Sequence, residues 1–150
     1  MSTSQNPSQN SFGGVNPIFR VENVAASIDY YIRKLGFTLL WRTPLFACVS
    51  RDRCSIFLSQ GDQGHPGAWV WIGVNDADAI HQEFLRSGAK IRHVPTNYQW
   101  AYELQAEDLD GNILRIGSDN KADQPIGEWL DMHGQRWIHS GDSNWCRIEK

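Results

Sequence analysis

The sequence has few cysteines, no long hydrophobic run and no excess of basic residues. Cys48, Cys54 and Cys146 cannot all pair within one chain, and their spacing matches no common metal-binding motif. No apolar segment reaches the ~18 residues that would suggest a membrane span, and residues 1–10 lack the basic end and apolar run of a signal peptide. A net charge of −3 gives little support for a nucleic-acid surface. We therefore expect a cytoplasmic protein with reduced thiols that binds neither nucleic acid nor membranes.

Recognisable catalytic motifs are also missing. No nucleophile-base pair and no glycine-rich phosphate loop stands out. Tryptophan, in contrast, is abundant, with seven in 150 residues. Some of these rings must belong to the core, but seven are more than a small core easily satisfies.

Residues 15–60 are predicted to form a strand, a helix and three more strands. Apolar residues after the first run recur with helical spacing, and Asn23 and Gly36 suit the two ends of such a helix. Three short apolar runs separated by turn residues then predict strands at 37–41, 45–50 and 55–59.

Residues 68–118 repeat this order. A strand is expected at 68–74, followed by a helix that begins near Asn75 or Asp76 and ends at Gly88. Three further strands are expected at 90–94, 102–106 and 113–116. The last two are joined by a hairpin turn at Asp110-Gly111, where glycine supplies the positive φ that a tight turn needs.

The two patterns amount to an internal repeat of about fifty residues. Setting Val21 on Val74 brings Gly36 within one residue of Gly88. We therefore predict an α+β fold of paired βαβββ modules, because each half-sheet needs cover for its apolar face. The predicted organisation begins with a disordered N-terminal arm (1–14), followed by one domain (15–120) that contains the two modules (15–60 and 68–118). A tryptophan-rich C-terminal extension (121–150) is expected to pack on the domain or on a partner.

The order of these elements, together with two segments, resembles the vicinal oxygen chelate superfamily of glyoxalases, bleomycin resistance proteins and dioxygenases. The segments are Tyr-Tyr-Ile-Arg-Lys-Leu-Gly-Phe at 30–37 and Glu-Asp-Leu-Asp-Gly-Asn at 107–112. Within the superfamily the chain is most similar to bleomycin resistance proteins, with Trp100 and Glu103 ahead of the hairpin as in that family. The resemblance covers about 15–118 and implies a curved mixed sheet and a homodimer. It also implies grooves that sequester a cationic, aromatic glycopeptide drug, with Trp100 lining the groove.

The resemblance also implies where the enzymes of the superfamily hold a divalent metal. Those positions fall on Asn16, Phe57, Trp69 and Arg115. Phenylalanine and tryptophan offer no lone pair suited to a hard cation, and a guanidinium repels one. We therefore expect no metal, no cofactor and no catalytic residues.

Without a metal, the open face of the sheet is expected to bind a ligand. Strand alternation places Trp69 and Trp71 on one face, and aromatic faces attract cations by roughly 0.5–2 kcal/mol per contact. The alternative is that these two rings belong to the core. The candidate ligand-binding residues are Phe57, Trp69, Trp71, Trp100, Tyr102, Glu103 and Arg115.

Three functions are compatible with these patterns. The first is a metal-independent, dimeric protein that sequesters a small aromatic or cationic molecule, as in bleomycin-like antibiotic resistance. The second is a metal-dependent enzyme of glyoxalase or dioxygenase type with displaced ligands. The third, less favoured, is a regulatory or partner-binding module that uses its tryptophan-rich tail.

Overall fold

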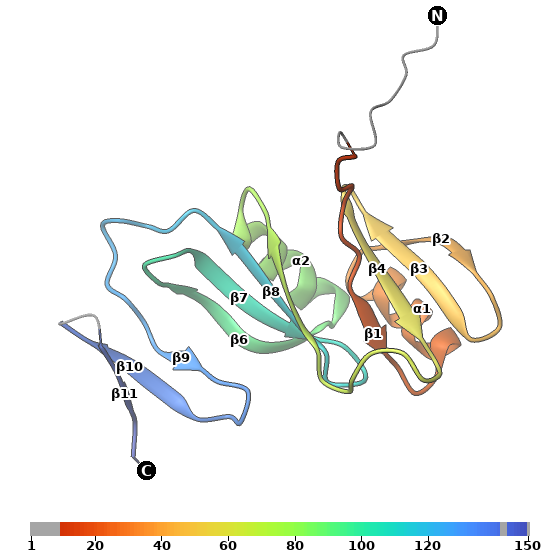
Figure 1. Cartoon of the computed structure of the whole chain (residues 1–150). Helices are drawn as coiled ribbons and strands as arrows, with labels where there is room; N and C mark the ends of the chain where they lie inside the picture. Colours follow the sequence, from red (N-terminus) through yellow and green to blue (C-terminus); the bar gives the residue numbers. More distant parts are fainter. Residues whose placement is uncertain (1–9, 142–143, 150) are drawn as a thin grey trace, which may run out of the picture.

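The computed structural model describes residues 10–141 and 144–149. The chain forms two four-stranded sheets, with strand orders β1-β4-β3-β2 and β5-β8-β7-β6, and a three-stranded sheet, β11-β10-β9 (Figure 1). The elements are β1 (Ile18–Arg20), α1 (Val24–Arg33), β2 (Thr38–Arg42), β3 (Phe46–Arg51), β4 (Cys54–Ser59), β5 (Trp69–Gly73), α2 (Ala77–Ser87), β6 (Lys90–Asn97), β7 (Tyr102–Glu107), β8 (Ile113–Ser118), β9 (Trp129–Leu130), β10 (Arg136–Ser140) and β11 (Asn144–Arg147).

The first half of the domain contains the predicted strand, helix and three further strands. The N-cap of α1 is Asn23, whose side-chain oxygen accepts a hydrogen bond from the Ala26 amide at 2.9 Å. Gly36 follows the helix with a φ of 77°, a value that favours glycine. β1 pairs in parallel with β4, and β3 pairs antiparallel with both β4 and β2. The predicted N-cap is therefore confirmed, and Gly36 lies two residues beyond the C-cap, Lys34.

The second half has the same topology. Asp76 caps α2 through a hydrogen bond from the Ala79 amide, and Gly88 ends the helix in the left-handed conformation. β5 pairs in parallel with β8, as β1 does with β4. The strand order β5-β8-β7-β6 repeats β1-β4-β3-β2 element by element, so the predicted repeat is confirmed.

The two halves share one hydrophobic core, which lies between the sheets and their helices (Figure 1). An ion pair also joins them, because the Arg51 guanidinium on β3 donates to both carboxylate oxygens of Glu83 on α2, at 2.6 and 2.8 Å. Tyr30 adds a third link. Its hydroxyl donates to the Glu107 carbonyl and accepts from the Lys90 amide.

The hairpin turn between β7 and β8 also joins the two halves. Asp108 is buried, and its carboxylate accepts hydrogen bonds from the Asp110 amide, the Asn112 amide and the Asn112 side chain. The hydroxyl of Tyr31, on α1, donates to the same carboxylate at 2.9 Å. Gly111 takes the predicted positive φ of 78°. The turn therefore fixes its own backbone and also holds the first helix.

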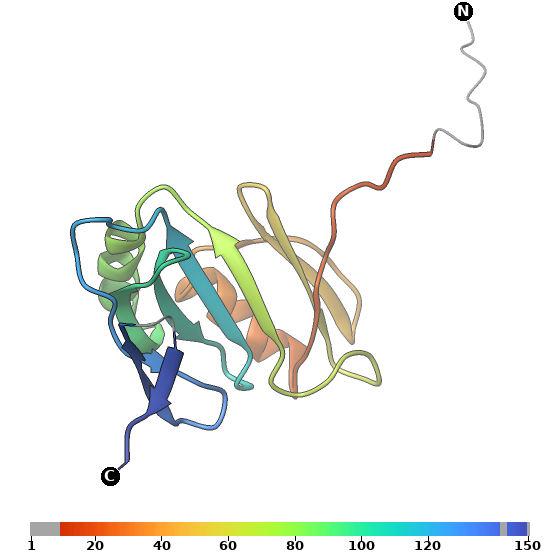
Figure 2. The same ribbon diagram turned by 60° about the vertical axis from the view of Figure 1, so that its left-hand side comes forward.

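The segments outside the repeat differ in their contacts. Of the predicted N-terminal arm, residues 1–9 lie outside the described residues, and residues 10–14 are exposed and run away from the domain without regular structure (Figure 2). The chain joins the domain just before β1, where the Pro17 carbonyl accepts from the Phe57 amide at 2.9 Å. The C-terminal extension packs on the second half of its own chain through β9, β10 and β11 (Figure 1). Across residues 10–141 and 144–149, no helix is both long and apolar enough to cross a membrane.

Candidate functional site

Strand alternation places a set of aromatic and charged side chains on the face of the second sheet opposite α2, which we call the open face. β5 contributes Trp69 and Trp71, and Trp71 lies in register with Arg115 of β8. Arg115 in turn lies opposite Gln105 of β7. Glu103 precedes Gln105 by two residues on β7, so it lies on the same face. The predicted pairing of Trp69 and Trp71 on one face is therefore seen in the structure.

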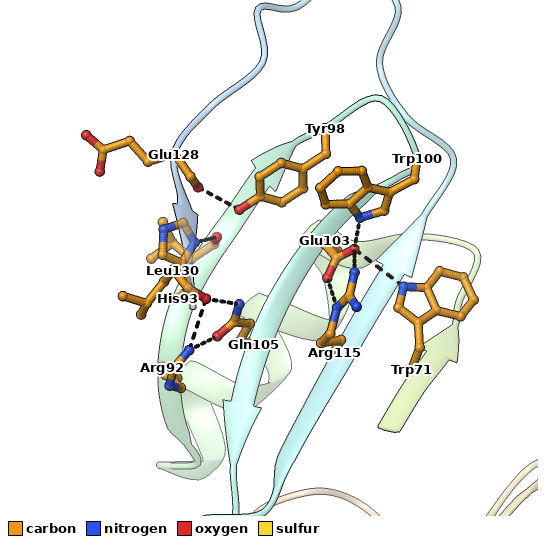
Figure 3. A network of polar contacts seen from close by, with 11 residues as sticks. Trp71, Arg92, His93, Tyr98, Trp100, Glu103, Gln105, Arg115, Glu128 and Leu130 are labelled. Atoms are coloured by element: carbon orange, nitrogen blue, oxygen red, sulfur yellow. Dashed lines mark hydrogen bonds and ion pairs between the residues drawn. The ribbon is translucent and has the colours of Figure 1, made fainter. Parts of the chain in front are cut away.

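Glu103 is the centre of this face. Its side chain is only 1% exposed, and its Oε2 accepts from Arg115 Nε at 2.8 Å while Oε1 accepts from Arg115 Nη2 at 3.0 Å. The indole N–H groups of Trp100 and Trp71 also donate to Oε1, at 2.5 and 3.4 Å (Figure 3). A buried carboxylate needs such a complete set of donors. Here Glu103 and its three donor residues, Arg115, Trp100 and Trp71, are four of the predicted site residues held in one network.

Two glycines make room for the ring of Trp71. A Cβ on Gly117 would lie 3.0 Å from Trp71 Cζ2, and a Cβ on Gly73 would lie 3.2 Å from Trp71 Cζ3. The ring therefore lies against bare backbone on one side and keeps 49% of its surface exposed on the other. Its N–H is held by Glu103, so the orientation of the exposed face is fixed.

Trp100 is supported from behind by Tyr98. The two rings stack with centroids 4.8 Å apart and planes 6° apart. Tyr98 is buried, which raises the pKa of its hydroxyl to about 12, and this hydroxyl donates to the Glu128 carbonyl at 2.7 Å. Trp100 is 46% exposed. A cavity of about 200 Å3, which we call the slot, lies between Trp71 and Trp100 and is also lined by Asn75, Ser118 and Asp119.

The other predicted site residues lie apart from the slot. Trp69 faces the C-terminal extension, with its ring centroid 6.3 Å from that of Trp129. Phe57 lies on the first half, in an aromatic cluster with Trp41 and Phe46 whose centroids are 5.4–5.8 Å apart. We call this cluster the first-half triad.

Tyr102 points in the opposite direction. It precedes Glu103 on β7, so its side chain lies on the α2 side of the sheet, where its hydroxyl donates to Asp78 Oδ1 at 2.6 Å. Burial, followed by this hydrogen bond, raises the Tyr102 pKa to about 12. The structure therefore does not bring Tyr102 together with the slot.

Sequence reasoning missed several residues of the open face. Tyr98 supports Trp100, Gln105 and Arg92 bind the backbone of the extension, and Trp129 packs over Arg115. Gln105 could have been found, because it alternates with Glu103 on β7. The contacts of Trp129 depend on tertiary structure alone.

The positions where the superfamily enzymes hold a metal do not suit a divalent cation here. Arg115 is bound to Glu103, and the guanidinium of Arg92 lies 5.4 Å from the centre of the Trp69 ring. Phe57 is part of the first-half triad, and Asn16 is exposed. Within the part of the chain that the structure describes, no group of three or more His, Cys, Asp or Glu residues could hold a metal ion.

Comparisons with known proteins agree with this architecture. The family model of the Glyoxalase/Bleomycin resistance protein/Dioxygenase superfamily matches residues 14–116. No curated protein sequence matches the chain.

Among solved structures, a similar one is the bleomycin-binding protein from the bleomycin producer Streptomyces verticillus, complexed with copper(II)-bleomycin. It is 22% identical, has a TM-score of 0.65, and the match covers 75% of this chain and 100% of that one. TnmS3, an antibiotic binding protein from Streptomyces sp. CB03234, is 20% identical, with the same coverage and TM-score. TioX from Micromonospora sp. ML1 is 19% identical over 71% of this chain and 98% of that one, with a TM-score of 0.62.

The family model ends at residue 116, so the extension that carries Trp129 lies outside the matched part. The match nevertheless spans more than half of the 150 residues and both βαβββ modules. The chain belongs to the glyoxalase/bleomycin resistance protein/dioxygenase superfamily.

Proposed function

We propose that the protein binds a small planar aromatic or cationic molecule in the slot between Trp71 and Trp100, without a metal ion. The observation that carries this proposal is that one carboxylate holds both rings in place. Both indole N–H groups donate to the buried Glu103, while about half of each ring remains exposed. Rings that are held in place before a ligand arrives lose little conformational freedom on binding, which favours affinity.

The charges around the slot favour a cation over an anion. The carboxylate of Glu103 is paired with Arg115, so it contributes little net charge to the slot. The faces of Trp71 and Trp100 present the negative side of an aromatic quadrupole, and Asp119 lines the slot as well. A planar cation would satisfy both features at once.

The solved relatives support the ligand class. One is named a bleomycin-binding protein and another an antibiotic binding protein. We infer that the molecule sequestered by this chain belongs to the same broad class of aromatic antibiotics and related planar compounds. Metal independence is supported by the donor chemistry at Phe57, Trp69 and Arg115.

The first test is the variant Trp100→Ala. If a ligand stacks on Trp100, loss of the ring should weaken binding by about 1–3 kcal/mol, the range measured for stacked aromatics. Binding is measured by isothermal titration calorimetry with N-methylquinolinium, a flat two-ring cation, with proflavine and with bleomycin. Titrations before and after treatment with a chelator should coincide, because no metal is involved.

Trp100→Phe is the matched control, since it keeps an aromatic ring over Tyr98 while it removes the pyrrole ring and its hydrogen bond to Glu103. It should retain most of the affinity, and both variants are compared with the parent by melting curves. A Trp100→Ala variant that binds all probes as the parent does would rule out the slot as the binding site. Failure of the parent to bind any probe would rule out the ligand class.

We also propose that two chains associate through the first-half triad. Trp41 is 44% exposed, and Leu40 and Leu45 nearby are more exposed still. Leu40 and Leu45 are the chain neighbours of Trp41 and Phe46. Exposed apolar surface of this kind marks an interaction site, and the family resemblance implies a homodimer. Light scattering at micromolar concentration should give about twice the 17.1 kDa chain mass.

The variant Trp41→Glu tests whether the triad forms the interface. A buried, unpaired carboxylate is costly, so the variant is expected to be monomeric at the concentration at which the parent is dimeric. Leu85→Glu is the control, because Leu85 is also exposed but lies on α2. A monomeric parent would contradict the dimer, and a dimeric Trp41→Glu variant would place the interface elsewhere.

A further inference from the structure

The C-terminal extension crosses the open face in the manner of a bound peptide. The Glu128 carbonyl accepts from the Tyr98 hydroxyl, and the Leu130 carbonyl accepts from Gln105 Nε2 at 3.1 Å and from Arg92 Nη1 at 3.3 Å (Figure 3). The polar side chains of the open face therefore bind the backbone on both sides of Trp129. These groups are no longer available to a ligand.

Trp129 fills the space above the centre of the face. The Arg115 guanidinium lies 4.9 Å from the centre of its ring. Its centroid is 5.8 Å from that of Trp100, 5.7 Å from that of Tyr98 and 6.3 Å from that of Trp69. A flat ligand that stacked on Arg115 or lay over Trp69 would need the volume that Trp129 occupies.

The start of the extension is also held firmly. The Asn97 side chain donates to the carbonyls of Lys121 and Gln124 and accepts from the Lys121 amide. The Gly127 amide donates to the Asn97 carbonyl at 2.9 Å, and any Cβ on Gly127 would collide with the side chain of Thr96. These contacts hold the start of the extension in a fixed position beside the open face.

We propose that Trp129 is the residue that sets the size of the ligand. It closes the Arg115 and Trp69 side of the open face and leaves the slot between Trp71 and Trp100 open. This inference rests on the proposed function, and it narrows the ligand class to compact planar cations. A cavity of about 200 Å3 is smaller than the ~300–1,000 Å3 of sites that enclose drug-sized ligands.

The experiment compares the full-length parent with Trp129→Ala, Trp129→Leu and a control, Leu130→Ala. The leucine variant keeps apolar packing against Arg115 while it removes the ring. Leu130 is adjacent on β9, so its side chain alternates to the other side of the strand. Affinities for N-methylquinolinium and for bleomycin are measured by calorimetry at a temperature where melting curves show all four proteins folded.

Both Trp129 variants are expected to bind bleomycin at least about tenfold more tightly than the parent, a difference that calorimetry resolves easily. Their affinity for N-methylquinolinium should change less than about threefold, because the slot is intact. The control should match the parent with both probes. A gain for bleomycin supports the inference when the parent binds N-methylquinolinium. If the parent binds neither probe, the inference falls together with the proposed ligand class.

Two results would overturn the inference while leaving the proposed function standing. One is a parent that binds bleomycin as tightly as the Trp129 variants. The other is a parent that binds N-methylquinolinium and Trp129 variants that gain nothing for bleomycin. Absence of binding for both probes in every protein would overturn the inference together with the proposed function.

Discussion

The variant Glu103→Ala is expected to lower the free energy of unfolding by about 3–5 kcal/mol, the cost of removing one partner of a buried ion pair. The Glu103 side chain is 1% exposed and accepts two hydrogen bonds from Arg115 and one from each of two indoles. Its removal leaves a partly buried guanidinium without a counter-charge. For a domain of this length the melting temperature should fall by roughly 6–20 °C, measured by calorimetry or circular dichroism.

Glu128→Ala is the matched control for this variant. The Glu128 carboxylate pairs with Arg136 at 2.9 Å, and both side chains are well exposed, so its loss should cost less than about 1 kcal/mol. The double variant Glu103→Ala/Arg115→Met should recover part of the stability, because the unpaired cation is removed as well. Equal melting temperatures for Glu103→Ala and Glu128→Ala would show that the Glu103 network contributes little.

The fold could be predicted because its signals are local. Asn23 and Asp76 are N-caps by virtue of their own side chains, and Gly88 and Gly111 take backbone conformations that disfavour other residues. These short-range preferences set the element boundaries in both halves. Once the two patterns are seen to repeat, the strand order follows from the superfamily resemblance.

The site could be predicted only in part. Alternation along a strand is enough to place Trp69 and Trp71 on one face, and the same rule separates Tyr102 from its neighbour Glu103. The hydrogen bonds from Trp71 and Trp100 to Glu103 depend on side-chain rotamers and on strand register, which the sequence does not specify. Composition and spacing therefore indicate the members of the site but not their pairing.

The extension was the least predictable part of the chain. Its strands are only two to five residues long, so they offer no periodic pattern of useful length. One signal was present, because Trp129, Trp137 and Trp145 recur at every eighth position and the structure places one in each strand. The packing of the extension against the open face depends on tertiary contacts with residues some thirty positions earlier, such as the hydrogen bond from Tyr98 to the Glu128 carbonyl.

The variant Asp108→Ala is expected to be destabilised by at least about 3 kcal/mol, because several buried donors lose their acceptor at once. Tyr31 and Asn112 are fully buried, so water cannot replace the lost carboxylate. Burial raises the Tyr31 pKa well above 10, and its hydroxyl stays protonated and needs an acceptor at all ordinary pH values. The free energy of unfolding is measured by urea denaturation.

Two further variants serve as controls. Asp110→Ala tests the turn without the contact to the first helix, and Asp108→Asn keeps the shape of the side chain but removes its charge. Asp110→Ala, two residues along, loses only an exposed bond from the Glu22 amide and should cost less than about 1 kcal/mol. Burial raises the Asp108 pKa despite its hydrogen bonds, so between the unfolded pKa and the raised folded pKa the folded state holds more protons than the unfolded state. This group therefore makes the parent lose stability as the pH rises from the unfolded pKa through the raised folded pKa. Asp108→Asn, which cannot ionise, should remove that part of the pH dependence. A parallel pH profile in the parent and Asp108→Asn would contradict the assignment, as would equal unfolding free energies for Asp108→Ala and Asp110→Ala.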